Sequence, residues 1–136
     1  MAASKDLSLV FELGDYADRP LAASSKVYRH TALGQVAGTN TYRALVAGDK
    51  FAGITLDGCD NSAGAAGAAF VRTRVQGKVL LTVAGASAAT AVGASVYASA
   101  DDTYTTTSSG NSLVGKVVGW DAATSKCVVE FNAATV

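Results

Sequence analysis

An alternation of side-chain character within the stretch 69–98 constrains the fold more than any other feature of the sequence. From residue 70 to residue 83, the odd positions are almost all apolar and the even positions are mostly charged or polar. A two-residue period is typical of a β-strand that buries one face. The odd set is Val71, Thr73, Val75, Gly77, Val79, Leu81 and Val83, and the polar even set is Arg72, Arg74, Gln76, Lys78 and Thr82.

Gly77 lies in the middle of this run, where a hairpin turn or a bend is possible. A two-residue turn at Gln76-Gly77 would place Val75 opposite Lys78 and would mix apolar and charged side chains on both faces, whereas pairing registers normally keep one face apolar. We therefore expect residues 70–83 to form one strand, or two collinear strands, bent at Gly77. Long bent strands are typical of barrels and curled sandwiches.

Charge and composition narrow the classes of partner. Eleven basic and eleven acidic residues among 136 give a formal net charge of zero, which argues against electrostatic binding to nucleic acid or to an anionic membrane. The apolar fraction is 49% and only 16% of residues are charged, so many small, weakly polar side chains must be exposed. Such a surface suits a protein that ends up in an assembly.

The length of 136 residues predicts a single domain that is large enough to bury its own hydrophobic core.

Cys59 and Cys127 are far apart in the sequence and lack CxxC or CxxH spacing, so we expect two structural thiols in a reducing compartment. Asp6 and Glu12 bracket the short apolar run near the N-terminus, which argues against a signal peptide. No segment reaches the roughly 20 apolar residues of a membrane-spanning helix. Synthesis in the cytosol is therefore expected.

Residues 1–24 are interpreted as an N-terminal arm joined to a body that spans residues 25–136. Alternating apolar residues predict a first strand in the arm, and a turn-rich passage with the only proline, Pro20, follows. A strand with one apolar edge can add itself to a sheet of its own domain or to a sheet of a neighbour. The apolar positions are Leu7, Leu9, Phe11 and Leu13.

The sequence of the body predicts short strands that are separated by glycine-containing turns. These turns are expected at Leu33-Gly34, at residues 37–40 and at Gly48-Asp49. Two hairpins are expected, one around Asp101-Asp102 and one around residues 121–125. The best helical segment, residues 85–95, is limited to two turns by flanking glycines. The sequence thus predicts an all-β fold, a small β-barrel or curled β-sandwich of short antiparallel strands with an extended N-terminal arm. In the last strand, Cys127, Val129 and Phe131 should share one face.

His30 is the only histidine and is expected on a strand, with Tyr28 on the same parity. A Ser-His-Asp triad is assembled in space and so needs no fixed spacing, but the chain has no GxSxG and no other signature of an activated nucleophile. Residues 64–67, GAAG, lack the Lys-Ser/Thr of a phosphate-binding loop. We expect no catalytic residue.

Two acidic clusters carry oxygen ligands that a hard cation such as calcium prefers. Neither has the spacing of an EF-hand, and Asp and Asn commonly bond their own backbone at turns. We therefore expect no metal and no cofactor. The clusters are Asp57, Asp60 and Asn61, and the pair Asp101 and Asp102.

Arg72, Arg74 and Lys78 form a basic row that is too short, and too poor in interleaved aromatic residues, for a nucleic-acid surface. A row that forms salt bridges or faces a protein partner is expected instead. Trp120, the only tryptophan, is expected to anchor the core or an interface.

The second half of the chain, from GKVLLTVAGA to KCVVEF, resembles the capsid cement, or head decoration, proteins of tailed bacteriophages. The similarity lies in the order of short motifs and covers about residues 25–132, whereas residues 1–24 match no pattern of the family. The motifs are a glycine and a short apolar strand, a glycine and a V-Y strand, a Thr-rich hairpin, a "vGkv" strand and a V-E-F strand. They correspond to Gly77 to Val83, Gly93 to Tyr97, Thr103 to Thr107, Leu113 to Val118 and Val128 to Phe131, with a further "G-d-f-G-i" segment at residues 44–58.

The resemblance implies a non-enzymatic protein of the virion that binds the outer surface of the capsid and bridges neighbouring major capsid protein subunits. Its other partners would be copies of itself, with a trimer favoured by analogy, and it would be made in the cytoplasm of the host bacterium. A virion fibre or spike subunit and a small carbohydrate-binding β-domain or hydrolase are the alternatives. The residues expected to contact the partner are Leu7, Leu9, Phe11, Leu13, Tyr16, Arg72 and Arg74.

Deletion of residues 1–14 should leave a folded, soluble protein that no longer binds phage heads, because the apolar arm is the expected contact. Co-sedimentation with undecorated heads measures this binding. Occupancy at the level of the full-length protein would contradict the assignment of the arm.

Overall fold

The computed structural model describes residues 14–134, and all of its regular structure in that range is β-strand. The strands form a five-stranded sheet with the order β1-β7-β5-β3-β4, a six-stranded sheet with the order β8-β13-β12-β10-β11-β9, and the pair β2-β6. The predicted all-β class is confirmed. In chain order the strands are β1 (Tyr16–Pro20), β2 (Ser25–Val27), β3 (Ala32–Gln35), β4 (Tyr42–Ala44), β5 (Lys50–Thr55), β6 (Cys59–Asn61), β7 (Phe70–Arg74), β8 (Gln76–Leu81), β9 (Val83–Ala84), β10 (Ser95–Ala100), β11 (Thr103–Thr105), β12 (Ser112–Asp121) and β13 (Lys126–Asn132).

The bent strand predicted at Gly77 connects the two large sheets. β7 pairs with β1 and β5, whereas β8 pairs with β13, and only Val75 separates β7 from β8. The hairpin interpretation is therefore excluded, because β7 and β8 do not pair with each other. Gly77 has a φ of 148°, and a Cβ there would lie 2.7 Å from Nε of Arg74. The positive φ favours glycine at the bend, whereas the atoms that a Cβ would meet belong to the flexible end of the Arg74 side chain, which can shift.

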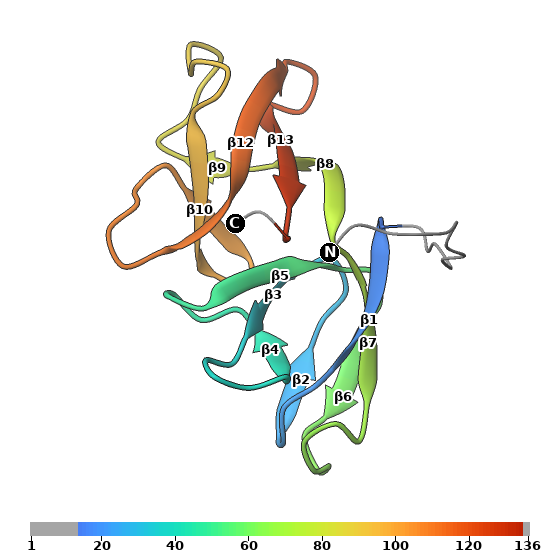
Figure 1. The fold of residues 1–136 in the computed structure, drawn as a ribbon. Helices are drawn as coiled ribbons and strands as arrows, with labels where there is room; N and C mark the ends of the chain where they lie inside the picture. Colours follow the sequence, from blue (N-terminus) through green and yellow to red (C-terminus); the bar gives the residue numbers. More distant parts are fainter. Residues whose placement is uncertain (1–13, 135–136) are drawn as a thin grey trace, which may run out of the picture.

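The six-stranded sheet curls strongly, because its two outer strands, β8 and β9, are consecutive in the chain and only Thr82 separates them. β8 pairs with β13 at one end of the sheet, and β9 pairs with β11 at the other end. One extended stretch therefore serves both ends of the sheet, which gives the sheet its barrel-like shape in the upper half of Figure 1.

Two clusters of buried side chains stabilise these layers. Leu33 and Val71 pack on one face of the five-stranded sheet, toward β2 and β6. Phe51 and Ile54 project from the other face into the core of the six-stranded sheet. There the rings of Phe51 and Phe131 meet edge to face, with centroids 5.9 Å apart and an interplanar angle of 86°. The two sheets therefore share one continuous apolar contact.

Several local predictions are confirmed and others are wrong. β10 and β11 form the predicted hairpin around Asp101-Asp102, and β12 and β13 form the second. Residues 85–95, the best helical candidate, contain isolated turns closed by Thr90 to Ser87 and Ala94 to Ala91 and no helix, in agreement with the all-β prediction. Leu33-Gly34 lies inside β3 and is no turn, because both residues are buried and pair with β4 on one side and with β5 on the other. His30 lies in a turn with a φ of 58°, not on a strand.

The described part of the predicted arm belongs to the body. β1 pairs along its whole length with β7, and Leu21 is fully buried in the smaller core. An arm that ends at residue 24 is therefore too long, because residues 16–21 supply a sheet strand and a core side chain. The candidate residues Leu7, Leu9, Phe11 and Leu13 lie outside the described residues.

Gly115 and Gly119 of β12 provide a matched test of the packing between β12 and β13. A Cβ at Gly115 would collide with the carbonyl group of Glu130 and lie 3.1 Å from Cα of Phe131, whereas a Cβ at Gly119 would lie 3.7 Å from the Val128 side chain. Gly115→Ala should lower the free energy of unfolding by about 1–3 kcal/mol, and Gly119→Ala should change it by less than about 0.5 kcal/mol. Urea unfolding measures both, and equal effects of the two variants would contradict the register.

Candidate interaction surface

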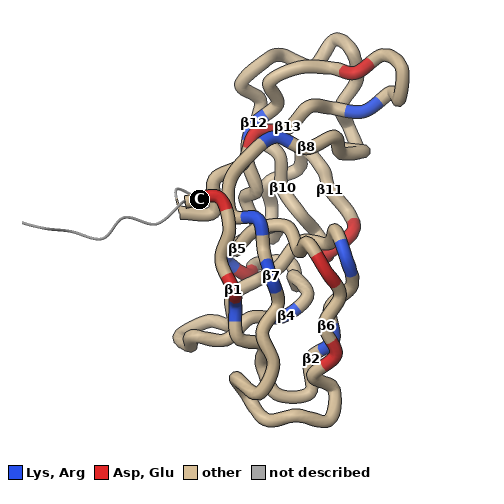
Figure 2. Tube along the Cα trace, turned by 90° about the vertical axis from the view of Figure 1, so that its right-hand side faces the viewer, with Lys and Arg blue, Asp and Glu red and all other residues tan. Residues whose placement is uncertain are grey.

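β1 and β7 present an exposed face at the edge of the five-stranded sheet. Their antiparallel register places Tyr16 opposite Arg74, Asp18 opposite Arg72 and Pro20 opposite Phe70. Even-numbered residues of both strands share this face, while Val71 and Thr73 point into the protein and are fully buried. The predicted contact residues Tyr16, Arg72 and Arg74 are thus brought together, and Figure 2 shows the basic positions along β7 beside β1.

Tyr16 is the centre of this face. The guanidinium carbons of Arg72 and Arg74 each lie 5.5 Å from the centroid of its ring, within the range of cation–π attraction. Arg74 also donates from Nε to the carbonyl oxygen of Gln76 at 3.0 Å. Neither arginine forms an ion pair with a described residue, so both retain donors for a partner. Tyr16 is 41% exposed and Phe70 is 60% exposed.

Lys78, the third member of the predicted basic row, lies beyond the bend and lines a different feature. A groove of about 330 Å³ runs along β8, where the end of β5 and the turn before β3 approach it. Its apolar residues are Ile54, Leu56, Val79, Leu80, Leu81 and Phe131, and its basic or titratable residues are His30, Arg74 and Lys78.

Phe70 and Leu80 were missed as candidate residues, although the sequence contains a signal for both. They are the two apolar side chains at even positions between residues 70 and 82, where polar side chains are the rule. Both are exposed, Phe70 on the β1–β7 face and Leu80 along the groove. An apolar residue at an otherwise polar position of a strand is therefore the sequence signal for these two exposed side chains.

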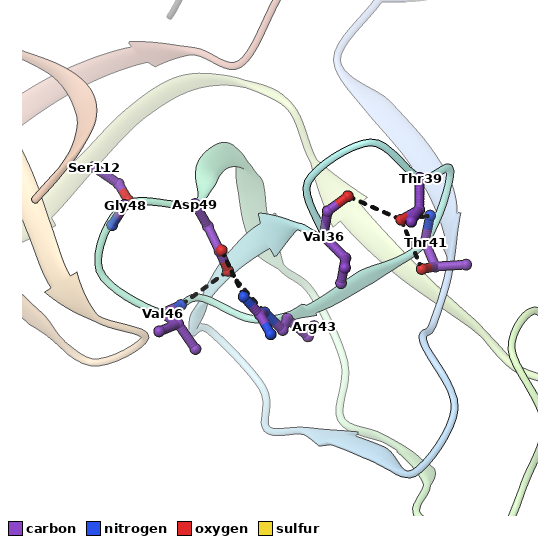
Figure 3. A network of polar contacts seen from close by, with 8 residues as sticks. All are labelled: Val36, Thr39, Thr41, Arg43, Val46, Gly48, Asp49 and Ser112. Carbon is purple, nitrogen blue, oxygen red and sulfur yellow. Dashed lines mark hydrogen bonds and ion pairs between the residues drawn. The ribbon is translucent and has the colours of Figure 1, made fainter.

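A polar network at the turn between β4 and β5 joins the two large sheets, and the sequence did not predict it. Arg43 donates to both carboxylate oxygens of Asp49, at 2.8 and 3.0 Å, and the backbone N–H of Val46 donates to Asp49 at 3.1 Å. The backbone N–H of Gly48 donates to Oγ of Ser112 in β12 at 3.1 Å. Figure 3 shows this arrangement, in which a single turn connects β5 to the six-stranded sheet.

The other side chains singled out in the sequence, and Tyr104, lie in the core or on the open surface. Burial and the nearby carboxylates of Asp101 and Asp102 raise the pKa of Tyr104 to about 12, so this phenol is neutral at physiological pH. Nε2 of His30 accepts a bond from Arg29 at 3.4 Å and lies on the exposed surface. Cys127 is buried, and burial raises the pKa of its thiol. Both cysteines are free, and Trp120 packs, half-buried, against the larger core.

In the first acidic cluster, the predicted bond of a side chain to nearby backbone is confirmed for Asp60. Oδ1 of Asp60 accepts bonds from the backbone N–H and the hydroxyl of Ser62, which lower its pKa. The buried amide of Asn61 donates to the carbonyl oxygens of Ala22 and Ala65, both at 3.0 Å. Across residues 14–134, no three His, Cys, Asp or Glu side chains gather closely enough to hold a metal ion. Within the same range of residues there is no helix long and apolar enough to cross a bilayer.

In comparisons with known proteins, no family model, no curated protein and no solved structure matches this chain. The resemblance to phage cement proteins therefore stays a prediction from the sequence motifs. Two surface features lie at the bend, the β1–β7 face and the groove along β8.

Asp49→Asn tests the network at the β4–β5 turn. Partial burial raises the pKa of Asp49, but the bonds from Arg43 and Val46 and the charge of Arg43 outweigh this effect, so the pKa lies below its ordinary value. Because the pKa is lower in the folded state, ionised Asp49 contributes to the free energy of unfolding, and this contribution is complete at pH values above the unfolded-state pKa, which is near 4. The contribution is lost as the pH falls through the folded-state pKa. Arg43 is 39% exposed, so the loss at pH 7 should be only about 1 kcal/mol.

Thermal unfolding at pH 7 and pH 3 measures this effect. The difference between Asp49→Asn and the wild type should shrink at the lower pH. Asp57→Asn, at an exposed turn, is the matched control and should be neutral at both values. A difference that is as large at pH 3 as at pH 7 would contradict the charged pair.

Proposed function

We propose that this protein is a non-enzymatic cement protein that binds the outer surface of an assembled phage capsid and bridges neighbouring major capsid protein subunits. The observation that carries the proposal is the β1–β7 face, where Tyr16 and Phe70 are exposed beside Arg72 and Arg74. Aromatic residues and arginine are the residue types that are enriched at protein–protein contacts. Because these side chains project from paired strands, a partner can bind them at little cost in ordering.

The rest of the surface supports an adhesive role. Net charge is zero and charged residues are few, which suits close packing against another protein. The described titratable groups are held in turns, in the core or on the open surface, as Asp60, Tyr104 and His30 show. None of these three has the paired, partly enclosed surroundings that an acid–base or nucleophilic mechanism needs.

The mechanism of a cement protein is thermodynamic linkage. A ligand that binds only the assembled shell stabilises that shell by mass action, and many weakly bound copies act together. In this proposal the barrel lies over a junction between capsid subunits, with the β1–β7 face toward one of them. Leu7, Leu9, Phe11 and Leu13 extend along a subunit as an added strand.

Phe70→Ser/Arg72→Ser tests the β1–β7 face. Both side chains are exposed, so the double variant should unfold at the wild-type temperature while its affinity for undecorated heads of the encoding phage falls at least about tenfold. The matched control, Val92→Ser/Lys116→Ser, removes one exposed apolar and one exposed basic side chain elsewhere. Co-sedimentation gives the affinities, and wild-type binding by the first variant would overturn the assignment of the face.

A further inference from the structure

We propose that, in the free protein, the groove along β8 receives residues 6–13 of a second copy of the chain as an added strand. This inference goes beyond the proposed function, because it concerns the protein before it meets any capsid. The groove lies along a sheet edge, since β8 is an outer strand of its sheet and, among residues 14–134, pairs with β13 alone. An outer strand directs half of its backbone N–H and C=O groups away from its partner, where an added strand can bind them.

The groove is apolar with a basic rim. Ile54 and Leu56 border it on one side, and Val79 and Leu81 line it from β8. No acidic residue lines it, whereas Arg74, Lys78 and His30 do. Leu80 is 42% exposed although it lies on a regular strand. An extended segment with one apolar face and carboxylate groups is the complementary occupant.

Residues 6–13, with the sequence DLSLVFEL, have both properties. Apolar side chains recur at every second position, so an extended segment would place all of them on one face. Asp6 and Glu12 lie near the two ends of the segment and are on the opposite parity. The apolar row would contact the lining of the groove, and the two carboxylates would lie near its basic rim. The row is Leu7, Leu9, Phe11 and Leu13.

The position of Asp15 indicates that the segment in the groove comes from a second copy and not from the same chain. The backbone N–H of Val75 donates to the carbonyl oxygen of Asp15 at 2.8 Å, which places the end of residues 1–13 on the β1 side of the bent strand. β5 lies on the other side of β7, and Ile54 at its end borders the groove. The segment of the same chain would have to cross the bent strand to enter the groove.

A segment from a neighbouring copy needs no such crossing. The resulting contact is heterologous, because the segment of one copy enters the groove of the next, and it forms a closed ring when the rotation between copies closes. The capsid contact proposed for Leu7, Leu9, Phe11 and Leu13 would then compete with this exchange. The free oligomer would release the segment only where a capsid subunit offers a better surface.

Light scattering of the full-length chain and of a variant that lacks residues 1–13 tests the exchange without any capsid. The full-length chain should have the mass of more than one copy at about 100 µM, and the truncated chain should have the mass of one. A fluorescein-labelled peptide of residues 5–14 should bind the truncated chain in a fluorescence anisotropy titration. Circular dichroism should give the same β spectrum for both chains.

Charge-reversal variants test whether the peptide binds in the groove or on another surface. Lys78→Glu should weaken binding of the peptide at least about tenfold, and a peptide with Asp6→Lys and Glu12→Lys should recover that binding. Lys116→Glu, on the same sheet but outside the groove, should leave the affinity unchanged. In the full-length chain, Lys78→Glu should shift the mass toward one copy, which keeps the test open if the truncated chain does not fold.

Three outcomes would overturn the proposal. A full-length chain that stays a single copy while the peptide binds the truncated chain would place the segment in the groove of its own chain. Oligomers of the truncated chain would show that the segment does not hold the copies together. Equal effects of Lys78→Glu and Lys116→Glu would exclude the groove. None of these outcomes bears on capsid binding, which the Phe70→Ser/Arg72→Ser variant tests separately.

Discussion

The passage of one extended strand from the five-stranded sheet to the six-stranded sheet at Val75 is the constraint on which the rest of the structure depends. β7 belongs to one sheet and β8 to the other, so the single residue between them keeps the two sheets adjacent. Gly77 allows the turn because its φ of 148° is unfavourable for other residues. The contact of Phe51 with Phe131 and the bond from Gly48 to Ser112 then hold the two sheets together from other sides.

The same bend creates both candidate contact surfaces. Before it, the even side chains of β7 project beside Tyr16 and form the β1–β7 face. After it, β8 has no described partner on its second edge, and the end of β5 approaches that edge to enclose the groove. Arg74 belongs to both, because it contacts the ring of Tyr16 and also lines the groove. The proposed capsid contact and the proposed exchange between copies would thus use two different surfaces that share Arg74.

Prediction from the sequence succeeded where one strand carries the information and was wrong where a local pattern competes with distant contacts. The parity of residues 70–83 predicted which side chains are buried, as Val71 and Thr73 show. The alanine-rich segment 85–95 has helical propensity, but its flanking glycines limit it, and it forms turns between β9 and β10. The sequence of residues 16–21 was interpreted as part of a turn-rich arm, but these residues form β1 and place Leu21 in the smaller core. This packing depends on the pairing of β1 with β7, which is distant in the chain.

The sequence by itself determined the all-β class, the two hairpins, the bend at Gly77 and which side chains of a strand share its apolar face. These features depend on a two-residue period and on the backbone conformation of glycine, and both act over a few neighbouring residues. Only the tertiary structure decided which strands pair across the bend, that Arg43 and Asp49 meet at one turn, and that Leu80 lies along a groove with a basic rim. Those features join residues that are distant in the chain, and their energies depend on burial and geometry that no local pattern encodes.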